Sequence, residues 1–240
     1  MRQNAVVARP RVVLVPGFTQ TASSWRRAAD VVRTSCDVRA LDVPAPGTFS
    51  ATARAIGTAG GTGIYVGYSM GGRLCLRLAL DRPDVVRGLM LVSTSPGIAD
   101  PTERAARVEA DELLADGVER DGVAAFLESW LAQPMFATVP PEAPGLADRR
   151  RLTSEFLAAC LRRLGAGAMD PMWSEVPQLG MPVLLVTGSR DEKYTAIARR
   201  MLERMHAQVA HVQLDGGHAL PLEQPEVLGG LITAFATEHG

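Results

Sequence analysis

The sequence predicts an α/β protein with a mostly parallel sheet, flanked by helices and interrupted by one helical insertion. Short apolar runs rich in β-branched residues alternate with helical patterns along most of the chain, and a repeated strand–helix–strand order builds a parallel sheet with helices on both faces. Several of these apolar runs are continuous, as expected for strands that are buried on both faces. The alternation fails once, between Pro96 and Val176.

Each expected strand is a short apolar run with turn residues near its ends. In chain order the strands are expected at Val12–Val15, Val38–Leu41, Ile64–Val66, Leu89–Val92, Val183–Thr187 and Val209–Leu214. Helical periodicity is found between or after them, at Ser23–Arg33, Gly72–Ala79, Ala196–His206 and Pro225–Ala236. This order places the carboxyl ends of the strands at one edge of the sheet, where open α/β sheets bind ligands.

The stretch that breaks the alternation is predicted to be a helical lid. Its helical patterns lie at Thr102–Ala115, Gly122–Leu131 and Leu146–Leu164, and the turn "VPPEAPG" at Val139–Gly145 is expected to be exposed between them. Insertions of this kind cover the carboxyl ends of the strands and close over bound ligands. We therefore predict a core at residues 1–95 and 177–240 and a lid at residues 96–176.

Composition indicates one soluble globular domain. The 240 residues are 47% hydrophobic and 21% charged, and the net charge is −1, so neither nucleic acid nor a membrane is an expected partner. No apolar run approaches membrane-spanning length. The first residues lack the apolar segment and cleavage site of a signal peptide.

The three cysteines, Cys36, Cys75 and Cys160, are far apart and show no metal-binding spacing. We expect buried, reduced thiols, a cytoplasmic location, and no metal or organic cofactor. The chain is expected to be a monomer or a homodimer. Its cations are unevenly distributed, because Lys193 is the only lysine and all other basic residues are arginines.

A catalytic serine is predicted at Ser69. The stretch "VGYSMGGR" contains the pattern G-x-S-x-G, with the strand "IYV" before it and an amphipathic helix after it. Glycines on both sides of the serine permit a sharp strand-to-helix turn, which raises the serine hydroxyl above the sheet. We interpret this turn as a nucleophile elbow rather than an ordinary glycine-rich turn.

A serine hydroxyl needs a base to take its proton, and on such folds the chain order is serine, acid, histidine. Asp191 and His218 follow two of the predicted strands in that order. Glu192 and Asp215 are the competing acids. The other histidines, His206, His211 and His239, are expected to have packing or surface roles.

The oxyanion-stabilising donors are expected to be the backbone N–H groups of Met70 and Phe18. Met70 begins the helix after the serine, and Phe18 lies in the loop "VPGFTQTASSW" after the first strand. Such donors are typically worth ~3 kcal/mol when negative charge develops on an oxygen. Together these features resemble the α/β-hydrolase fold, which supports esterases, lactonases, lyases and non-catalytic receptors alike.

Four stretches narrow this choice, and they read "GYSMGGR", "FLESWLAQPMF", "LRRLGAGAMDPMW" and "PVLLVTGSRDEKY". Together they resemble the 2-succinyl-6-hydroxy-2,4-cyclohexadiene-1-carboxylate synthases of menaquinone biosynthesis, over nearly the whole chain. The resemblance implies a lyase that eliminates pyruvate from a substrate with three carboxylates. Such a site needs fixed cations near the serine, and the planar guanidinium of arginine holds a carboxylate through two hydrogen bonds.

The resemblance also implies which residues bind this carboxylated small-molecule substrate. The implied residues are Tyr68, Arg73, Arg107, Trp130, Phe136 and Arg151. For Arg73 the alternative is a salt bridge that braces its helix. Arg149 and Arg150 compete with Arg151, since the three arginines are consecutive.

The chain departs from the family pattern at three places. Pro16 and Pro221 stand where histidine is common, and Ser189 replaces a glutamate. These departures leave room for a relative with a different substrate, such as another carboxylated metabolite. Two other functions also stay open. One is a serine hydrolase that cleaves a small ester, a lactone or a carbon–carbon bond, and the other is a non-catalytic receptor.

Overall fold

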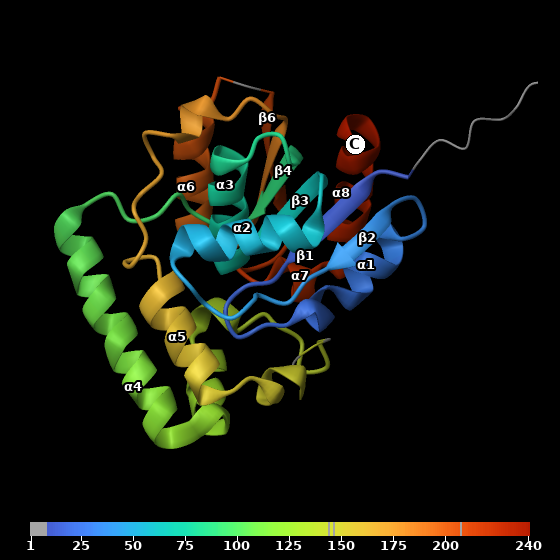
Figure 1. Ribbon diagram of the computed structural model, residues 1–240. Coiled ribbons are helices and arrows are strands. Elements are labelled where there is room, and N and C mark those ends of the chain that lie inside the picture. Colours follow the sequence, from blue (N-terminus) through green and yellow to red (C-terminus); the bar gives the residue numbers. More distant parts are fainter. Residues whose placement is uncertain (1–8, 144, 146, 207) are drawn as a thin grey trace, which may run out of the picture.

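One parallel sheet forms the centre of the protein, as predicted. The computed structural model describes residues 9–143, 145, 147–206 and 208–240. Its six strands lie in the order β2-β1-β3-β4-β5-β6, and every neighbouring pair is parallel (Figure 1). The strands are β1 (Arg11–Val15), β2 (Asp37–Ala40), β3 (Gly63–Tyr68), β4 (Val86–Val92), β5 (Val183–Gly188) and β6 (Val209–Leu214).

Helices cover both faces of the sheet. One face packs against α2 (Phe49–Gly60), α3 (Met70–Asp81) and α6 (Glu192–Leu202), and the other against α1 (Arg26–Val32) and α8 (Pro225–His239). A 3₁₀ turn, η1 (Ala22–Trp25), precedes α1, and the short α7 (Leu220–Glu223) precedes α8. Within β1, Val13 and Val15 face the first layer while Val12 and Leu14 face the second, which follows from the two-residue period of a strand.

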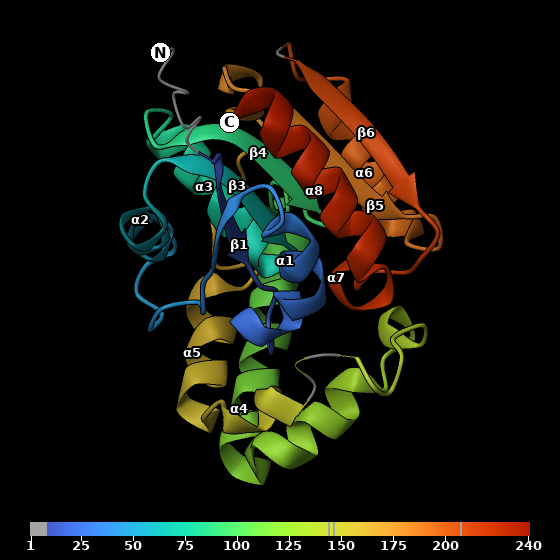
Figure 2. The ribbon, with the colours of Figure 1, turned by 90° about the vertical axis from the view of Figure 1, so that its right-hand side faces the viewer.

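The predicted insertion lies between β4 and β5, and among its described residues it contains helices only. They are α4 (Pro101–Leu131), η2 (Pro134–Phe136), η3 (Ala147–Arg151), α5 (Ser154–Leu164) and η4 (Val176–Gln178). Figures 1 and 2 show α4 and α5 side by side at one end of the sheet. Their contact encloses a small core of its own, which includes Val118, Phe126 and Leu157. That small core fits a helical lid, whereas Met169, Met172 and Trp173 pack in the main core, so the bounds 96–176 stay a prediction.

Helix α4 begins and bends where its sequence dictates. The Asp100 side chain accepts hydrogen bonds from the backbone N–H of Thr102 and Glu103, at 2.8 and 2.9 Å, and caps the helix. Gly122 then adopts φ 83° and ψ 168° inside the helix, a conformation that glycine adopts without steric cost. The two helices predicted on either side of Gly122 are therefore the two arms of α4.

The turn "VPPEAPG" is only partly exposed, which corrects the prediction. Pro141 and Glu142 are exposed, but Ala143 is buried in the hydrophobic cluster that contains α1. Pro144 lies outside the described residues, and so does Leu146, where the following helix was expected to begin. The turn packs against the core because an alanine side chain points inward.

No helix in the described part of the chain is long and apolar enough to cross a membrane.

Candidate active site

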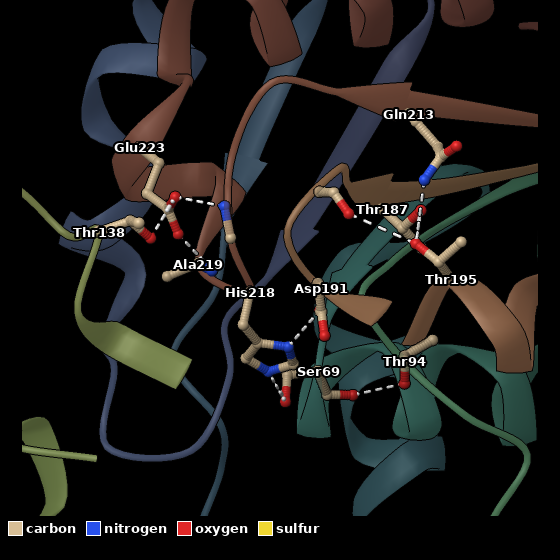
Figure 3. Close-up of polar contacts among 12 residues, drawn as sticks. Ser69, Thr94, Thr138, Thr187, Asp191, Thr195, Gln213, His218, Ala219 and Glu223 are labelled. Atoms are coloured by element: carbon tan, nitrogen blue, oxygen red, sulfur yellow. Dashed lines mark hydrogen bonds and ion pairs between the residues drawn. The ribbon is translucent and has the colours of Figure 1, made fainter. Parts of the chain in front are cut away.

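Ser69 occupies a strained turn between β3 and α3. Its backbone has φ 51° and ψ −112°, a region that non-glycine residues rarely adopt and that is associated with functional sites. The backbone N–H of Ser69 donates to Val92 O at 2.9 Å, and Thr94 Oγ1 donates to Ser69 O at 2.6 Å (Figure 3). These bonds to the end of β4 hold the turn in place.

Gly67→Ala is expected to destabilise the protein by about 1–3 kcal/mol, the usual cost of overpacking. An added Cβ would lie 2.5 Å from Gly71 O and 2.6 Å from Gly72 Cα, so the backbone of the turn has no room for it. Gly230→Ala in α8 is the matched control, because a Cβ there meets nothing within 4 Å. Thermal unfolding measures both variants, and equal stability of Gly67→Ala and the wild type would contradict the elbow geometry.

The structure brings Ser69, His218 and Asp191 into hydrogen-bond contact (Figure 3). His218 Nδ1 lies 2.8 Å from Asp191 Oδ2, and His218 Nε2 lies 3.2 Å from Ser69 Oγ. A carboxylate only accepts hydrogen bonds, so Nδ1 carries the proton and donates a hydrogen bond to Asp191. Nε2 is then free to accept the proton of the serine hydroxyl, which is the arrangement a catalytic triad requires.

The competing acids and histidines lie elsewhere. Glu192 is exposed, and Asp215 is exposed and paired with Arg190. His211 lies in the edge strand β6, where its Nε2 is 2.8 Å from Thr187 Oγ1. Among the acidic side chains that the structure describes, Asp191 is the one within hydrogen-bond distance of the His218 ring.

A cavity of about 360 Å³ opens beside Ser69, between the sheet and the insertion. Its walls combine the triad with aromatic, aliphatic and cationic side chains. The residues lining it are Phe18, Tyr68, Ser69, Met70, Arg73, Arg107, Leu114, Trp130, Gln133, Met135, Phe136, Cys160, Leu161, Leu164, Gly165, Asp191, Lys193, Tyr194 and His218. All but one of the predicted site residues are in this set, and the exception is Arg151.

The predicted oxyanion residues lie on the cavity wall. Met70 is the first residue of α3, and the first N–H groups of a helix have no partner within the helix. Phe18 precedes Thr19, whose φ of 65° marks a tight loop. The positions suit both backbone donors, and their oxyanion role stays a prediction.

Aromatic rings form the insertion side of the cavity. The Trp130 ring lies 5.0 Å from Phe18 in an edge-to-face arrangement and 6.0 Å from Phe136. Around the histidine, the ring centroids of Tyr68 and Phe136 lie 5.4 and 6.3 Å from that of His218. Burial raises the pKa of Tyr68 well above its usual value. Its phenol therefore stays neutral and carries no charge into the cavity.

Arg73 is a buried cation on the cavity wall. Its Nη2 donates to Leu164 O at 2.9 Å, while its Nε has no partner among the described residues. Burial lowers its pKa to about 10, so it is charged at neutral pH. Asp111 is close enough to oppose that shift but forms its ion pair with Arg107. Arg73 therefore forms no salt bridge with a residue that the structure describes, and its contact with substrate stays a prediction.

Arg107 forms an ion pair with Asp111 one helical turn along α4. Its Nε lies 2.8 Å from Asp111 Oδ1; the arginine side chain is 37% exposed and the aspartate 3%. Burial raises the pKa of Asp111, although Arg107 and Arg73 both oppose the shift. The one carboxylate of Asp111 thus lies near both Arg107 and Arg73, so these three groups together keep a net positive charge.

Lys193 and Tyr194 also line the cavity, and the sequence-based site did not include them. Lys193 Nζ lies 5.8 Å from the Tyr194 ring centroid, and that ring lies 4.6 Å from the ring of His218. Burial raises the pKa of Tyr194, against the opposing charges of Arg73 and Arg107. The signal for Lys193 was present in the sequence, as the one lysine among many arginines.

The prediction that Arg151 faces the pocket is wrong. Its side chain is 84% exposed and lies 3.3 Å from Asp148. Arg149 is the buried member of the run, at 1% exposure, and its Nη1 donates to Thr19 Oγ1 at 2.7 Å. Residues of a 3₁₀ helix point about 120° apart because it has about three residues per turn, so one of three consecutive arginines faces inward and the others face solvent.

No group of three or more histidine, cysteine, aspartate or glutamate side chains in the described part of the chain is arranged to hold a metal ion.

The sheet order, the strained serine turn and the serine–histidine–aspartate contacts define the α/β class of proteins with a nucleophile elbow. The model of the alpha/beta hydrolase family matches residues 12–229. The chain belongs to the alpha/beta hydrolase family.

Relatives within this family were found by sequence. A Bacillus subtilis protein, named provisionally as a 2-succinyl-6-hydroxy-2,4-cyclohexadiene-1-carboxylate synthase, is 34% identical over 177 residues. That match covers 72% of this chain and 65% of the relative, so this chain spans just under two thirds of it. A Salmonella agona protein with the name of that synthase is 26% identical, over 95% of this chain and 92% of its own length.

Solved structures share the fold. MenH from S. aureus superposes with a TM-score of 0.88 at 23% identity, covering 99% of this chain and 97% of the other. The enol-lactonase from Burkholderia xenovorans superposes with a TM-score of 0.77 at 19% identity, covering 96% and 92%. At these identities the likeness describes the fold alone.

Proposed function

We propose that this protein is a lyase that eliminates pyruvate from a carboxylated cyclohexene intermediate of menaquinone biosynthesis. Its proposed activity is that of a 2-succinyl-6-hydroxy-2,4-cyclohexadiene-1-carboxylate synthase. The names of the Bacillus subtilis and Salmonella agona relatives support this substrate class.

The observation that carries the proposal is the positive wall of the cavity beside Ser69. Arg73, Arg107 and Lys193 all line it, and a substrate with three carboxylates supplies three negative charges. Arg73 is buried without a salt bridge to a described residue, and Asp111, which is paired with Arg107, compensates its charge only in part. Burying a charge that is incompletely compensated is costly. An anionic substrate offsets that cost, whereas a neutral substrate leaves it in place.

In the proposed reaction Ser69 acts as a base. His218 accepts the hydroxyl proton through Nε2, and Asp191 stabilises the resulting imidazolium through Nδ1. The serine oxygen then removes a proton from a ring carbon of the substrate. The electrons of that C–H bond form a ring double bond, and the C–O bond to the pyruvyl group breaks with its electron pair on the departing oxygen. The proton on His218 Nε2 passes to that oxygen, so pyruvate leaves as its enol and the histidine returns to its neutral form.

The rest of the cavity serves this step in two ways. In this proposal the backbone N–H groups of Phe18 and Met70, residues that line the cavity, stabilise negative charge that develops on a substrate oxygen. The aromatic wall of Trp130 and Phe136 packs against the carbon ring and excludes water.

The purified protein is expected to release pyruvate from the pyruvate-bearing menaquinone precursor. The assay couples pyruvate to lactate dehydrogenase and follows NADH consumption, and a panel of p-nitrophenyl esters is supplied in parallel. We expect kcat/KM for the precursor to exceed that for every ester, because only the precursor carries carboxylates for the cationic wall. Ester cleavage without any release of pyruvate would contradict the lyase proposal.

A serine hydrolase is the second candidate. The same contacts of Ser69, His218 and Asp191 suit acyl transfer, in which Ser69 attacks a carbonyl carbon instead of removing a proton. Much of the cavity lining is apolar, which suits a small ester or lactone. The ester panel tests this candidate in the same experiment.

The proposal includes a cytoplasmic location and a chain that acts as a monomer or homodimer. Cys36, Cys75 and Cys160 are all buried free thiols, which supports a reducing compartment.

A further inference from the structure

The side chain of Glu223, in α7, holds the loop that carries His218. Its carboxylate accepts the backbone N–H of Gly217 at 2.5 Å and that of Ala219 at 2.8 Å (Figure 3). These two residues flank His218 on either side. A hydrogen bond to a charged acceptor is roughly twice as strong as a neutral one, so Glu223 restrains the backbone at the point from which the imidazole extends.

The insertion contacts the same carboxylate. Thr138 Oγ1 donates to Glu223 Oε2 at 2.7 Å, and Oε2 also accepts from Gly217. In Figure 3 the Thr138 side chain reaches Glu223 from the insertion side, while Ala219 approaches it from the His218 loop. One half-buried carboxylate thus joins two segments that are far apart in the chain.

Thr138 is tied to the wall of the cavity. It follows Phe136 by two residues, and Val139 N donates to Phe136 O at 3.0 Å, so the two side chains share one short turn. Phe136 lines the cavity beside Met135, and its ring lies 6.3 Å from that of His218. A movement of this wall therefore moves Thr138 as well.

Gly217 lets these groups approach one another. A Cβ at this position would lie 2.5 Å from Thr138 Oγ1 and 3.2 Å from Glu223 Oε1. Any larger residue would separate the insertion from the His218 loop. The contact between Thr138 and Glu223 therefore requires a glycine at position 217 as well as the two side chains.

We propose that Glu223 and Thr138 form a latch through which the helical insertion sets the position of His218. With Thr138 docked, Glu223 holds Gly217 and Ala219 so that His218 Nε2 stays within reach of Ser69. When the cavity wall shifts, the latch loosens, and His218 Nε2 is then no longer held in line with Ser69 Oγ. Glu223 is a positioning residue in this proposal, which concerns the triad and does not depend on the proposed substrate.

Glu223→Gln tests the latch on the whole protein. The amide keeps the shape but offers one acceptor oxygen, and its NH₂ group faces an N–H donor. We expect the rate at which a fluorophosphonate modifies Ser69 to fall about 30- to 100-fold, since a misplacement of about 1 Å can cost that much. In that reaction the serine oxygen forms a P–O bond and fluoride leaves with the proton.

The pH profile distinguishes positioning from mere stabilisation. A displaced His218 changes how the modification rate depends on pH, whereas a loss of folded protein alone leaves that profile unchanged. If Glu223→Gln only reduces the folded fraction and leaves rate and pH profile per folded molecule unchanged, the proposal is overturned.

Thr138→Val tests the contribution of the insertion. It removes one hydrogen bond and leaves the two backbone bonds of Glu223, so we expect a loss of about 3- to 10-fold. Thr237→Val on the surface of α8 is the matched control, because its hydroxyl bonds only Thr233 O within its own helix. When Thr138→Val is combined with Glu223→Gln, the double variant should lose no more activity toward the fluorophosphonate than Glu223→Gln alone.

Additive losses in the double variant would overturn the coupling between insertion and histidine. If Glu223→Gln fails to fold, an unchanged modification rate in Thr138→Val overturns the proposal by itself. Fluorophosphonate modification needs no natural substrate, so failure of the proposed lyase function would appear separately, as an absence of pyruvate release.

Discussion

Ser69→Ala is expected to lower kcat by about 10³-fold or more while the protein remains folded, as found when a member of a catalytic triad is removed. Ser69 Oγ lies 3.2 Å from His218 Nε2, and Ser69 lines the cavity. Alanine deletes the base of the elimination and equally the nucleophile of a hydrolase. The loss is therefore expected on any substrate that the protein turns over.

His218→Ala should cause a loss of similar size, because the two residues act as one unit and their effects are not additive. Ser129→Ala and His239→Ala are the matched controls, since both residues lie outside the cavity lining. Activity is measured together with circular dichroism and thermal unfolding. A folded Ser69→Ala protein with activity within tenfold of the wild type would rule out the triad assignment.

The contacts of Ser69, His218 and Asp191 were predictable because the position of each residue depends on local sequence. A glycine on either side of Ser69 fixes the elbow, and Asp191 and His218 each follow a strand that is recognisable by its apolar run. Parallel strands bring their carboxyl ends to one edge of the sheet, so the strand order alone predicts that the three side chains lie close together. The strand positions were predictable for the same reason.

The residues that were missed or misplaced depend on tertiary packing. The orientation of Arg149 and Arg151 is set by how η3 docks against Thr19, and the proline-rich turn before it has no periodicity to read. Burial of Ala143 in the same region is likewise a property of the assembled protein. The proposed role of Glu223 could not be predicted from the sequence, because it depends on hydrogen bonds to Gly217 and Thr138 that form only in the folded protein.

Arg73→Ala is expected to reduce kcat/KM for the carboxylated precursor far more than for a neutral ester. The buried guanidinium has no carboxylate partner among the described residues and is available to hold a substrate carboxylate in a partly desolvated site. Removing one partner of such a pair costs roughly 2–5 kcal/mol, or about thirtyfold to several thousandfold in kcat/KM. An ester without a carboxylate loses no such contact.

Two further variants show whether the loss in Arg73→Ala reflects a lost substrate contact or a lost structural contact. Arg73→Lys should recover only part of the loss, because an ammonium group cannot form the two parallel hydrogen bonds of a guanidinium. Arg77→Ala is the matched control one turn further along α3. Arg77 is paired with Asp81 at 2.7 Å and Glu175 at 2.9 Å and does not line the cavity, so its loss should lower the melting temperature without changing the preference between the two substrates. If Arg73→Ala behaves like Arg77→Ala, with equal losses on precursor and ester, then Arg73 is a structural residue and the lyase proposal rests on Arg107 and Lys193 alone.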